Sequence, residues 1–145
     1  MANSVQLDFQ GPDWPLGFVA VATPGTPISF MSNVDPGNTN SPNSPTSATS
    51  QEYTVRAEEI LVQAIRPGAS HGMQLNIGNV YILRAPTAGA SGNRDDPGSL
   101  VAMLLPGQTL FLTAAALNRN VWSPYRYYVD ADNAGDGVIV TLIIQ

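Results

Sequence analysis

The sequence predicts an all-β fold, an antiparallel sandwich or barrel of about eight strands, from three observations. Short runs rich in β-branched and aromatic residues recur along the chain. Pro/Gly and Asp/Gly turn signals separate these runs. No segment makes a convincing helix. Eight or nine short strands with such spacing are typical of a sandwich or barrel.

Three strands are expected in the first part of the chain. Residues 5–9 alternate apolar and polar side chains, as in a half-buried strand, before Gly11-Pro12-Asp13 ends the pattern. Residues 16–23 form the second strand, which Pro24-Gly25 stops. Residues 28–31 form a short third strand.

Residues 32–51 form one long polar loop. They are nearly all Ser, Asn, Thr, Pro, Gly and Asp. Such a composition cannot bury enough apolar area to offset the entropy lost on ordering. The loop is either a flexible linker or a segment that becomes ordered on a partner surface, since long loops in compact domains are usually flexible or functional.

The middle of the chain contributes four more strands. Residues 53–66 carry helix-favouring Glu and Ala, but their apolar positions alternate once a β-bulge is placed near Glu58-Glu59, so we expect a strand. Residues 73–82 also alternate, with a bulge or bend at Gly78. After a second loop at residues 85–99, strands are expected at residues 100–105 and 109–113.

Two strands close the chain. The penultimate strand is expected to start at residues 121–122, with a dent at Pro124, and to run to Asp130. Its odd-numbered residues from Tyr125 to Val129 share one face and its even-numbered residues share the other. An Asp/Asn/Gly turn leads into the last strand, residues 138–144.

Length and charge limit the functional classes. The 145 residues are expected to form one domain, residues 1–145, with a hydrophobic core. Charged residues are 12% of the chain, about half of the usual ~25%, and all six basic residues are Arg. A net charge of −5 without a basic cluster argues against a nucleic-acid partner. The sparse charge suits a surface that neighbouring subunits cover; codon bias towards Arg would explain the missing Lys but not this scarcity.

The chain is expected to be soluble and made in a cytoplasm, with no membrane partner. Residues 1–6 lack the basic start and apolar run of a signal peptide. The longest strongly apolar run, residues 138–144, is too short to cross a bilayer as a helix. Cysteine is absent, so neither disulfides nor thiol chemistry is possible.

The sequence predicts no enzyme and no catalytic, cofactor-binding or metal-ligating residue. His71 is the single histidine, too few for a cupin-like metal site, and Ser70-His71-Gly72 lacks the context of a catalytic triad, so His71 is expected in a solvent-facing loop. Glu58 and Glu59 are strand neighbours and point to opposite faces, which places them badly for an acid/base pair. Asp95-Asp96 belongs to a turn signal.

The segment 130–136 begins like a calcium-binding loop. Asp130 and Asp132 stand at the first and third ligand positions, and Gly135 stands at the sixth. The fifth position is Ala134 and the twelfth is Thr141, where a bidentate Glu belongs. We therefore interpret these Asp and Asn residues as turn formers that bond their own backbone in a β-hairpin.

An aromatic cluster accompanies Arg126 near the C-terminus: Trp122, Tyr125, Tyr127 and Tyr128. Such a cluster packs a core, lies at a protein interface or lines a sugar site. Packing in the core is the commonest of the three, and the pattern does not decide between the other two.

The order of several short motifs resembles that of small structural proteins of tailed bacteriophages. The pattern combines a Gly-Asn-Val-Tyr-Ile strand, a Leu-Pro-Gly-Gln turn and an aromatic Val-Asp-Ala strand before a Gly-Asp-Gly turn. The resemblance covers roughly residues 18–30 and 53–145 but not the 32–51 loop. In this chain the motifs are Pro24-Gly25-Thr26-Pro27 and residues 60–64, 78–82, 105–108, 127–132 and 135–138.

The resemblance implies a jelly-roll capsid cement or decoration protein on the outer surface of a virion. Such a protein binds the major capsid protein, bridges coat subunits and forms a homodimer or homotrimer at a symmetry axis. The alternative is a carbohydrate- or receptor-binding module of a phage tail or host-attachment structure, which the aromatic cluster would serve.

Overall fold

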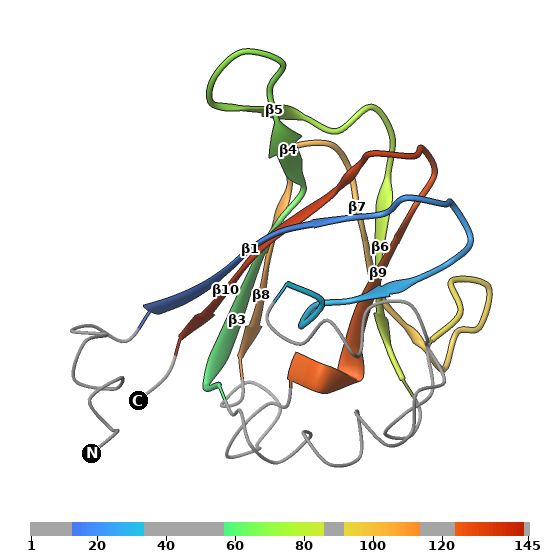
Figure 1. The fold of residues 1–145 in the computed structure, drawn as a ribbon. Coiled ribbons are helices and arrows are strands. Elements are labelled where there is room, and N and C mark those ends of the chain that lie inside the picture. Colours follow the sequence, from blue (N-terminus) through green and yellow to red (C-terminus); the bar gives the residue numbers. More distant parts are fainter. Residues whose placement is uncertain (1–12, 34–56, 86–91, 114–123, 144–145) are drawn as a thin grey trace.

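The computed structural model describes residues 13–33, 57–85, 92–113 and 124–143. In this part of the chain the fold is all-β with antiparallel sheets, as predicted. Two four-stranded sheets face each other as in a sandwich, and a two-stranded hairpin projects from one end (Figure 1).

The two sheets each combine strands that are distant in sequence. The first sheet has the order β1 (Asp13–Ala20), β10 (Gly137–Ile143), β3 (Glu59–Gln63) and β8 (Thr109–Thr113). The second sheet has the order β2 (Ile28–Ser29), β9 (Tyr127–Ala131), β6 (Val80–Arg84) and β7 (Leu100–Leu104). The projecting hairpin is β4 (Ile65–Pro67) with β5 (Met73–Leu75), and a 3₁₀ turn, Pro124–Arg126, precedes β9.

Successive strands mostly alternate between the sheets. Along the eight strands of the two described sheets, only β6 and β7 are consecutive neighbours in one sheet. Every other link crosses from one sheet to the other, so the pairing is mostly long-range. The longest pairing is that of β1 with β10, from Asp13 opposite Ile143 to Ala20 opposite Gly137.

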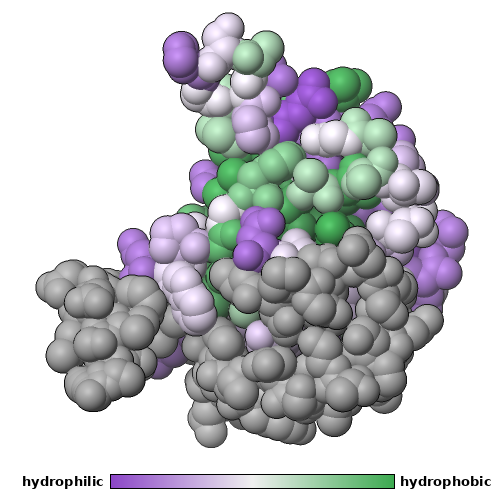
Figure 2. Space-filling view, viewed as in Figure 1, coloured by the Kyte–Doolittle hydropathy of each residue, from purple (hydrophilic) through white to green (hydrophobic). Residues whose placement is uncertain are grey.

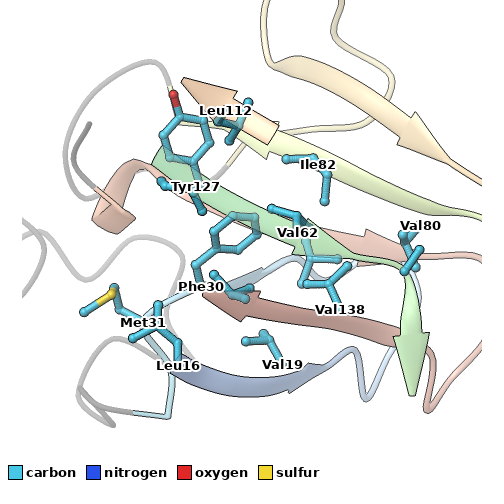
Figure 3. Packing of buried hydrophobic residues seen from close by; sticks show 14 of the residues in the cluster. Leu16, Val19, Phe30, Met31, Val62, Val80, Ile82, Leu112, Tyr127 and Val138 are labelled. Atoms are coloured by element: carbon cyan, nitrogen blue, oxygen red, sulfur yellow. The ribbon is translucent and has the colours of Figure 1, made fainter. Parts of the chain in front are cut away.

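The hydrophobic core lies between the inner faces of the sheets (Figure 3). β3 and β10 alternate buried and half-buried residues, so their apolar side chains point to the core in register. Phe30, which directly follows β2, stacks on Tyr127 of the neighbouring strand β9, with 6.0 Å between ring centroids. Burying each large apolar side chain contributes roughly 1.5–3 kcal/mol.

A second layer covers the outer face of the second sheet. A Cβ at Gly92 would lie 2.8 Å from the Cβ of Leu83 and 3.3 Å from that of Ser99, so residues 92–99 pack on this face. Beneath them, Leu83, Ala85 and Tyr128 form a small buried cluster. β9 is therefore buried on both faces: Tyr127 and Val129 point to the core and Tyr128 to this cluster, as the predicted faces require.

The first described strand differs from its prediction at both ends. β1 begins at Asp13, which we had assigned to a strand break, and it ends at Ala20 rather than at residue 23. A register shift between Pro15 and Gly17 lets the strand continue past the proline, and Gly17 has a φ of 85°. The predicted strands at residues 5–9 and 121–122 and nearly all of the 32–51 loop lie outside the described residues.

The predicted strands at residues 53–66 and 73–82 are each divided. Both Glu58 and Glu59 face Ile143: Glu58 N donates to Ile143 O (2.9 Å), and Glu59 is the paired residue opposite Ile143. Two residues opposite one are the arrangement of a β-bulge, as predicted near Glu58-Glu59. A further break at Ala64, which bonds to the β7–β8 turn, separates β3 from β4. Residues 76–79, where the bend at Gly78 was expected, carry the chain from the β4–β5 hairpin into the second sheet.

We expect Gly137→Ala to be among the most destabilising small substitutions in this chain. A Cβ at Gly137 would collide with the backbone carbonyl of Val19 and lie 3.0 Å from Ala20 Cα, so β1 would have to move away from β10. The free energy of unfolding should fall by about 3 kcal/mol in urea titrations. In the control Gly25→Ala, no atom lies within 4 Å of the new Cβ and only the left-handed φ of 88° is unfavourable, about 1 kcal/mol. Equal losses in the two variants would contradict the packing argument.

Candidate functional site

The Asp-rich segment 130–136 joins two different sheets. It connects β9 of the second sheet to β10 of the first, so the interpretation as a β-hairpin turn is wrong. Its three aspartates each bind a different set of partners. The segment therefore acts as a junction between distant parts of the chain.

Asp130 is a buried carboxylate with three partners. Its Oδ1 accepts hydrogen bonds from the backbone N–H groups of Gly25 and Ala131, both at 2.8 Å. Its Oδ2 lies 3.4 Å from Nε of Arg94. Because a buried charge is stable only when it is paired and hydrogen-bonded, these contacts hold the β1–β2 link and residues 92–99 against β9.

Arg94 connects Asp130 to the more exposed Asp132. Its Nη1 donates to Asp132 Oδ1 at 3.0 Å, and its guanidinium lies 5.0 Å from the ring centroid of Tyr81. The Tyr81 hydroxyl donates to Asp132 at 3.1 Å. Burial raises the pKa of Tyr81, and the hydrogen bond to Asp132 raises it further. Arg94 thus fastens residues 92–99 across the outer face of the second sheet.

Asp136 is fully buried at the start of β10. Its carboxylate accepts from the backbone N–H groups of Ile77 (2.9 and 3.0 Å) and Gly78 (2.8 Å), and Arg66 Nη1 lies 3.4 Å away. Next to it, the Asn76 side chain donates to Gly137 O at 2.8 Å and accepts from Gly137 N at 3.3 Å. The link between β5 and β6 is thereby fixed to the first sheet.

These contacts correct the interpretation of the aspartates as local turn formers. Asp130 does bond the next backbone N–H, but Asp132 and Asp136 bind groups that are more than 30 residues away in sequence. Asp130 and Asp132 share Arg94, whereas Asp136 contacts Arg66 and the link between β5 and β6. Among the residues that the structure describes, no group of three His, Cys, Asp or Glu is placed to hold a metal ion.

An open hollow of about 540 Å³ lies beside this network. Residues 25–27 form one wall, and residues 92–95 with Asp130 form the other. Its charged lining residues are Arg94, Asp95 and Asp130, and of these Arg94 and Asp130 are paired with each other. The hollow could accept a small polar ligand through the backbone and side-chain groups of residues 93–95.

The other residues that the sequence singled out have ordinary structural positions. His71 is exposed between β4 and β5, as predicted. Tyr125, Tyr127 and Tyr128 are buried, which confirms core packing for these members of the aromatic cluster, whereas Trp122 lies outside the described residues. Asp96 forms the expected turn, accepting from Gly98 N at 2.8 Å.

Sequence reasoning missed an exposed apolar surface at one end of the sandwich. We name it the apolar end; it comprises Met73, Leu75, Ile77, Met103 and Leu105, which are 47–64% exposed. A Cβ at Gly107 would lie 2.9 Å from Leu75 Cδ2, and Asn79 Nδ2 lies 3.7 Å from Met103 Sδ, so the hairpin and the second sheet meet here. In Figure 2 the top of the molecule shows hydrophobic residues interspersed with hydrophilic ones. The alternation in residues 73–77 was the available signal, but it predicted only a strand and not the exposure of its apolar residues.

Comparison with protein-family models, with curated proteins and with solved structures finds no match to this chain. No helix in the described ranges is long and apolar enough to cross a membrane.

We expect Arg94→Ala to destabilise the fold more than Asp132→Asn. Loss of Arg94 leaves the buried Asp130 carboxylate without its cation, which should lower the free energy of unfolding by about 2 kcal/mol. The Asp132 side chain is 40% exposed, so its neutralisation should change stability by less than about 1 kcal/mol. Urea titrations at pH 7 measure both values, and the reverse ranking would show that Asp130 does not need Arg94.

We expect Tyr128→Phe to stabilise the protein. The Tyr128 hydroxyl is buried without a hydrogen-bond partner in the described part of the chain, so its removal should raise the free energy of unfolding by about 1 kcal/mol near neutral pH.

The same variant should reduce the loss of stability at high pH. Burial raises the pKa of Tyr128 above its ordinary value of 10.0. Above pH 10 the unfolded chain releases this proton first, so the stability that is present below pH 10 is lost as pH rises towards the folded pKa. The pH-dependence of unfolding above pH 10 should be shallower in Tyr128→Phe, with Tyr81 supplying part of the remainder. Identical slopes would contradict the assignment to Tyr128.

Proposed function

We propose that this chain is a capsid cement or decoration protein of a tailed bacteriophage. In this proposal it lies on the outer surface of the virion, binds the major capsid protein and stabilises the shell non-covalently by bridging coat subunits. The order of the sequence motifs, from residues 24–27 to residues 135–138, is the first support. The exposed apolar end is the observation that carries the proposal.

The strand order supports a jelly roll, the fold that the motif order implies. If the eight strands of the two sheets are lettered B to I in chain order, the first sheet reads B-I-D-G and the second reads C-H-E-F. These are the orders that two Greek keys produce in a jelly-roll sandwich, a fold common among viral capsid domains. The β4–β5 hairpin is then an addition to the D–E link.

The apolar end has the character of a protein-binding surface. Contiguous exposed apolar residues mark sites of protein interaction in soluble proteins, because water contact with them is unfavourable. The projecting hairpin carries two of the five residues, Met73 and Leu75, and Ile77 follows directly after it, so a partner can reach them without rearrangement of the sandwich (Figure 1). Repeated on each copy of an oligomer, a modest patch gives strong retention on a shell.

The use of the charged groups supports a structural role rather than catalysis. Asp130, Asp132 and Asp136 each join segments that are distant in the chain. Arg66 and Arg94 are their cationic partners. These groups act as connectors, and the five residues of the apolar end are all uncharged.

The alternative is a carbohydrate- or receptor-binding module of a phage tail or host-attachment structure. The hollow beside residues 93–95 is the observation that favours it. Burial of the three tyrosines removes them as sugar-stacking platforms, so this alternative depends on the hollow and on Trp122. Binding on a glycan array that is lost in Trp122→Ala would support it over the capsid proposal.

The capsid proposal predicts that the purified protein binds expanded, undecorated phage heads. The double variant Leu75→Glu with Ile77→Glu should remain folded, because both side chains are exposed, and should lose at least tenfold in affinity in co-sedimentation, because it places two charges on the apolar end.

The matched control is Gln74→Glu, which adds charge on the opposite side of the same strand and should bind normally. Cryo-EM of decorated heads should place the β4–β5 hairpin against the shell. Failure of the wild-type protein to bind heads would refute the capsid function, and normal binding by the double variant would remove the apolar end from the interface.

A further inference from the structure

The edge strand β8 has a sequence that reads the same in both directions. It is Thr-Leu-Phe-Leu-Thr, residues Thr109–Thr113, with Phe111 at the centre. Among the described residues, β8 is the end strand of the first sheet, beside β3. Phe111 is 56% exposed, more than the exposed apolar residues of β7, Leu100, Val101 and Met103, which are 37–48% exposed.

The register fixes which backbone groups of β8 point away from β3. Ala64 N donates to Gln108 O (2.9 Å), and Ala64 is next to Gln63, which lies opposite Thr109. Because hydrogen-bonded positions alternate along an antiparallel pair, Leu110 and Leu112 exchange hydrogen bonds with β3. The backbone N–H and C=O of Phe111 therefore point away from β3, to the side on which the described residues place no further strand.

A two-fold axis through Phe111 would place complementary groups opposite each other. In an antiparallel pair of β8 strands, Phe111 faces the partner's Phe111, and the two residues exchange two backbone hydrogen bonds. Leu110 then faces the partner's Leu112, and each pair of opposed positions holds the same residue type. An interface of this kind is isologous, as a closed dimer requires.

We propose that the chain forms a two-fold dimer through antiparallel pairing of β8, which joins the two first sheets into one eight-stranded sheet. The partner is a second copy because the strand is complementary to itself in register and in residue type. β8 also contains no charged residue and no proline, the features with which natural edge strands prevent pairing.

The other end strand, β7, provides a contrast. It also lies at the end of its sheet in the described part of the chain, but its pairing with β6 shifts register between Ile82 and Leu83. Such irregularities twist an edge and protect it from pairing. Val101, which is 41% exposed on β7, is therefore a matched control position for Phe111.

Single cysteines test this dimer, because the chain has no cysteine of its own. In Phe111→Cys the two thiols would lie on directly opposed residues, about 5.5 Å apart at Cα, a separation that a disulfide spans. Oxidation at micromolar concentration should convert most of Phe111→Cys to a covalent dimer on non-reducing gels. Val101→Cys should remain mostly monomeric under denaturing conditions.

Light scattering provides the second measurement. The wild-type protein should be a dimer, Phe111→Lys should self-associate at least tenfold more weakly, and Val101→Lys should remain dimeric. A monomeric wild-type protein, equal cross-linking of the two cysteine variants, or an unchanged dimer in Phe111→Lys would overturn the proposal. The cysteine variant keeps the test valid if Phe111→Lys does not fold. These experiments use the chain alone, so their outcome is independent of the capsid function.

Discussion

The buried carboxylate of Asp136 is the interaction on which the arrangement of the sandwich most depends. A charge this deep is tolerated only if polar partners surround it, and its partners come from β4 and from the β5–β6 link. The backbone of the same residue accepts from Val21 N at 2.9 Å, which adds the end of β1. Asp136 therefore fixes the position of the link from the β4–β5 hairpin to the second sheet. It also fixes the start of β10, an inner strand of the first sheet.

The sequence predicted best those elements whose pattern is local. The bounds of β8 were predicted correctly because Pro106-Gly107 marks the turn before it, and the two faces of β9 follow from strict alternation. The predictions failed where a distant segment decides the outcome. Pro15 lies within β1, which is an end strand of its described sheet and shifts register against β10 after this residue. Periodicity also cannot show that residues 73–75 and 80–84 belong to different sheets.

The site was harder to predict than the fold for the same reason. The spacing of Asp130, Asp132 and Asp136 was visible, but their partners Gly25, Arg94 and Arg66 are brought to them by strand crossings that no short motif records. The apolar end depends on the same crossings, since Leu75 and Met103 belong to different sheets and meet near the β7–β8 turn. Local chemistry thus singled out the three aspartates but neither their arginine partners nor the residues of the apolar end.

The direction of β8 has a consequence for the shape of a paired molecule. The apolar end lies at the start of β8, next to Gly107, and the strands of an antiparallel pair run in opposite directions. A dimer joined through β8 would therefore carry its two apolar ends at opposite extremities of one continuous sheet. Such a dimer would have one apolar binding surface at each end. It could bind two neighbouring subunits at once, and the length of the joined sheet would set the distance between them.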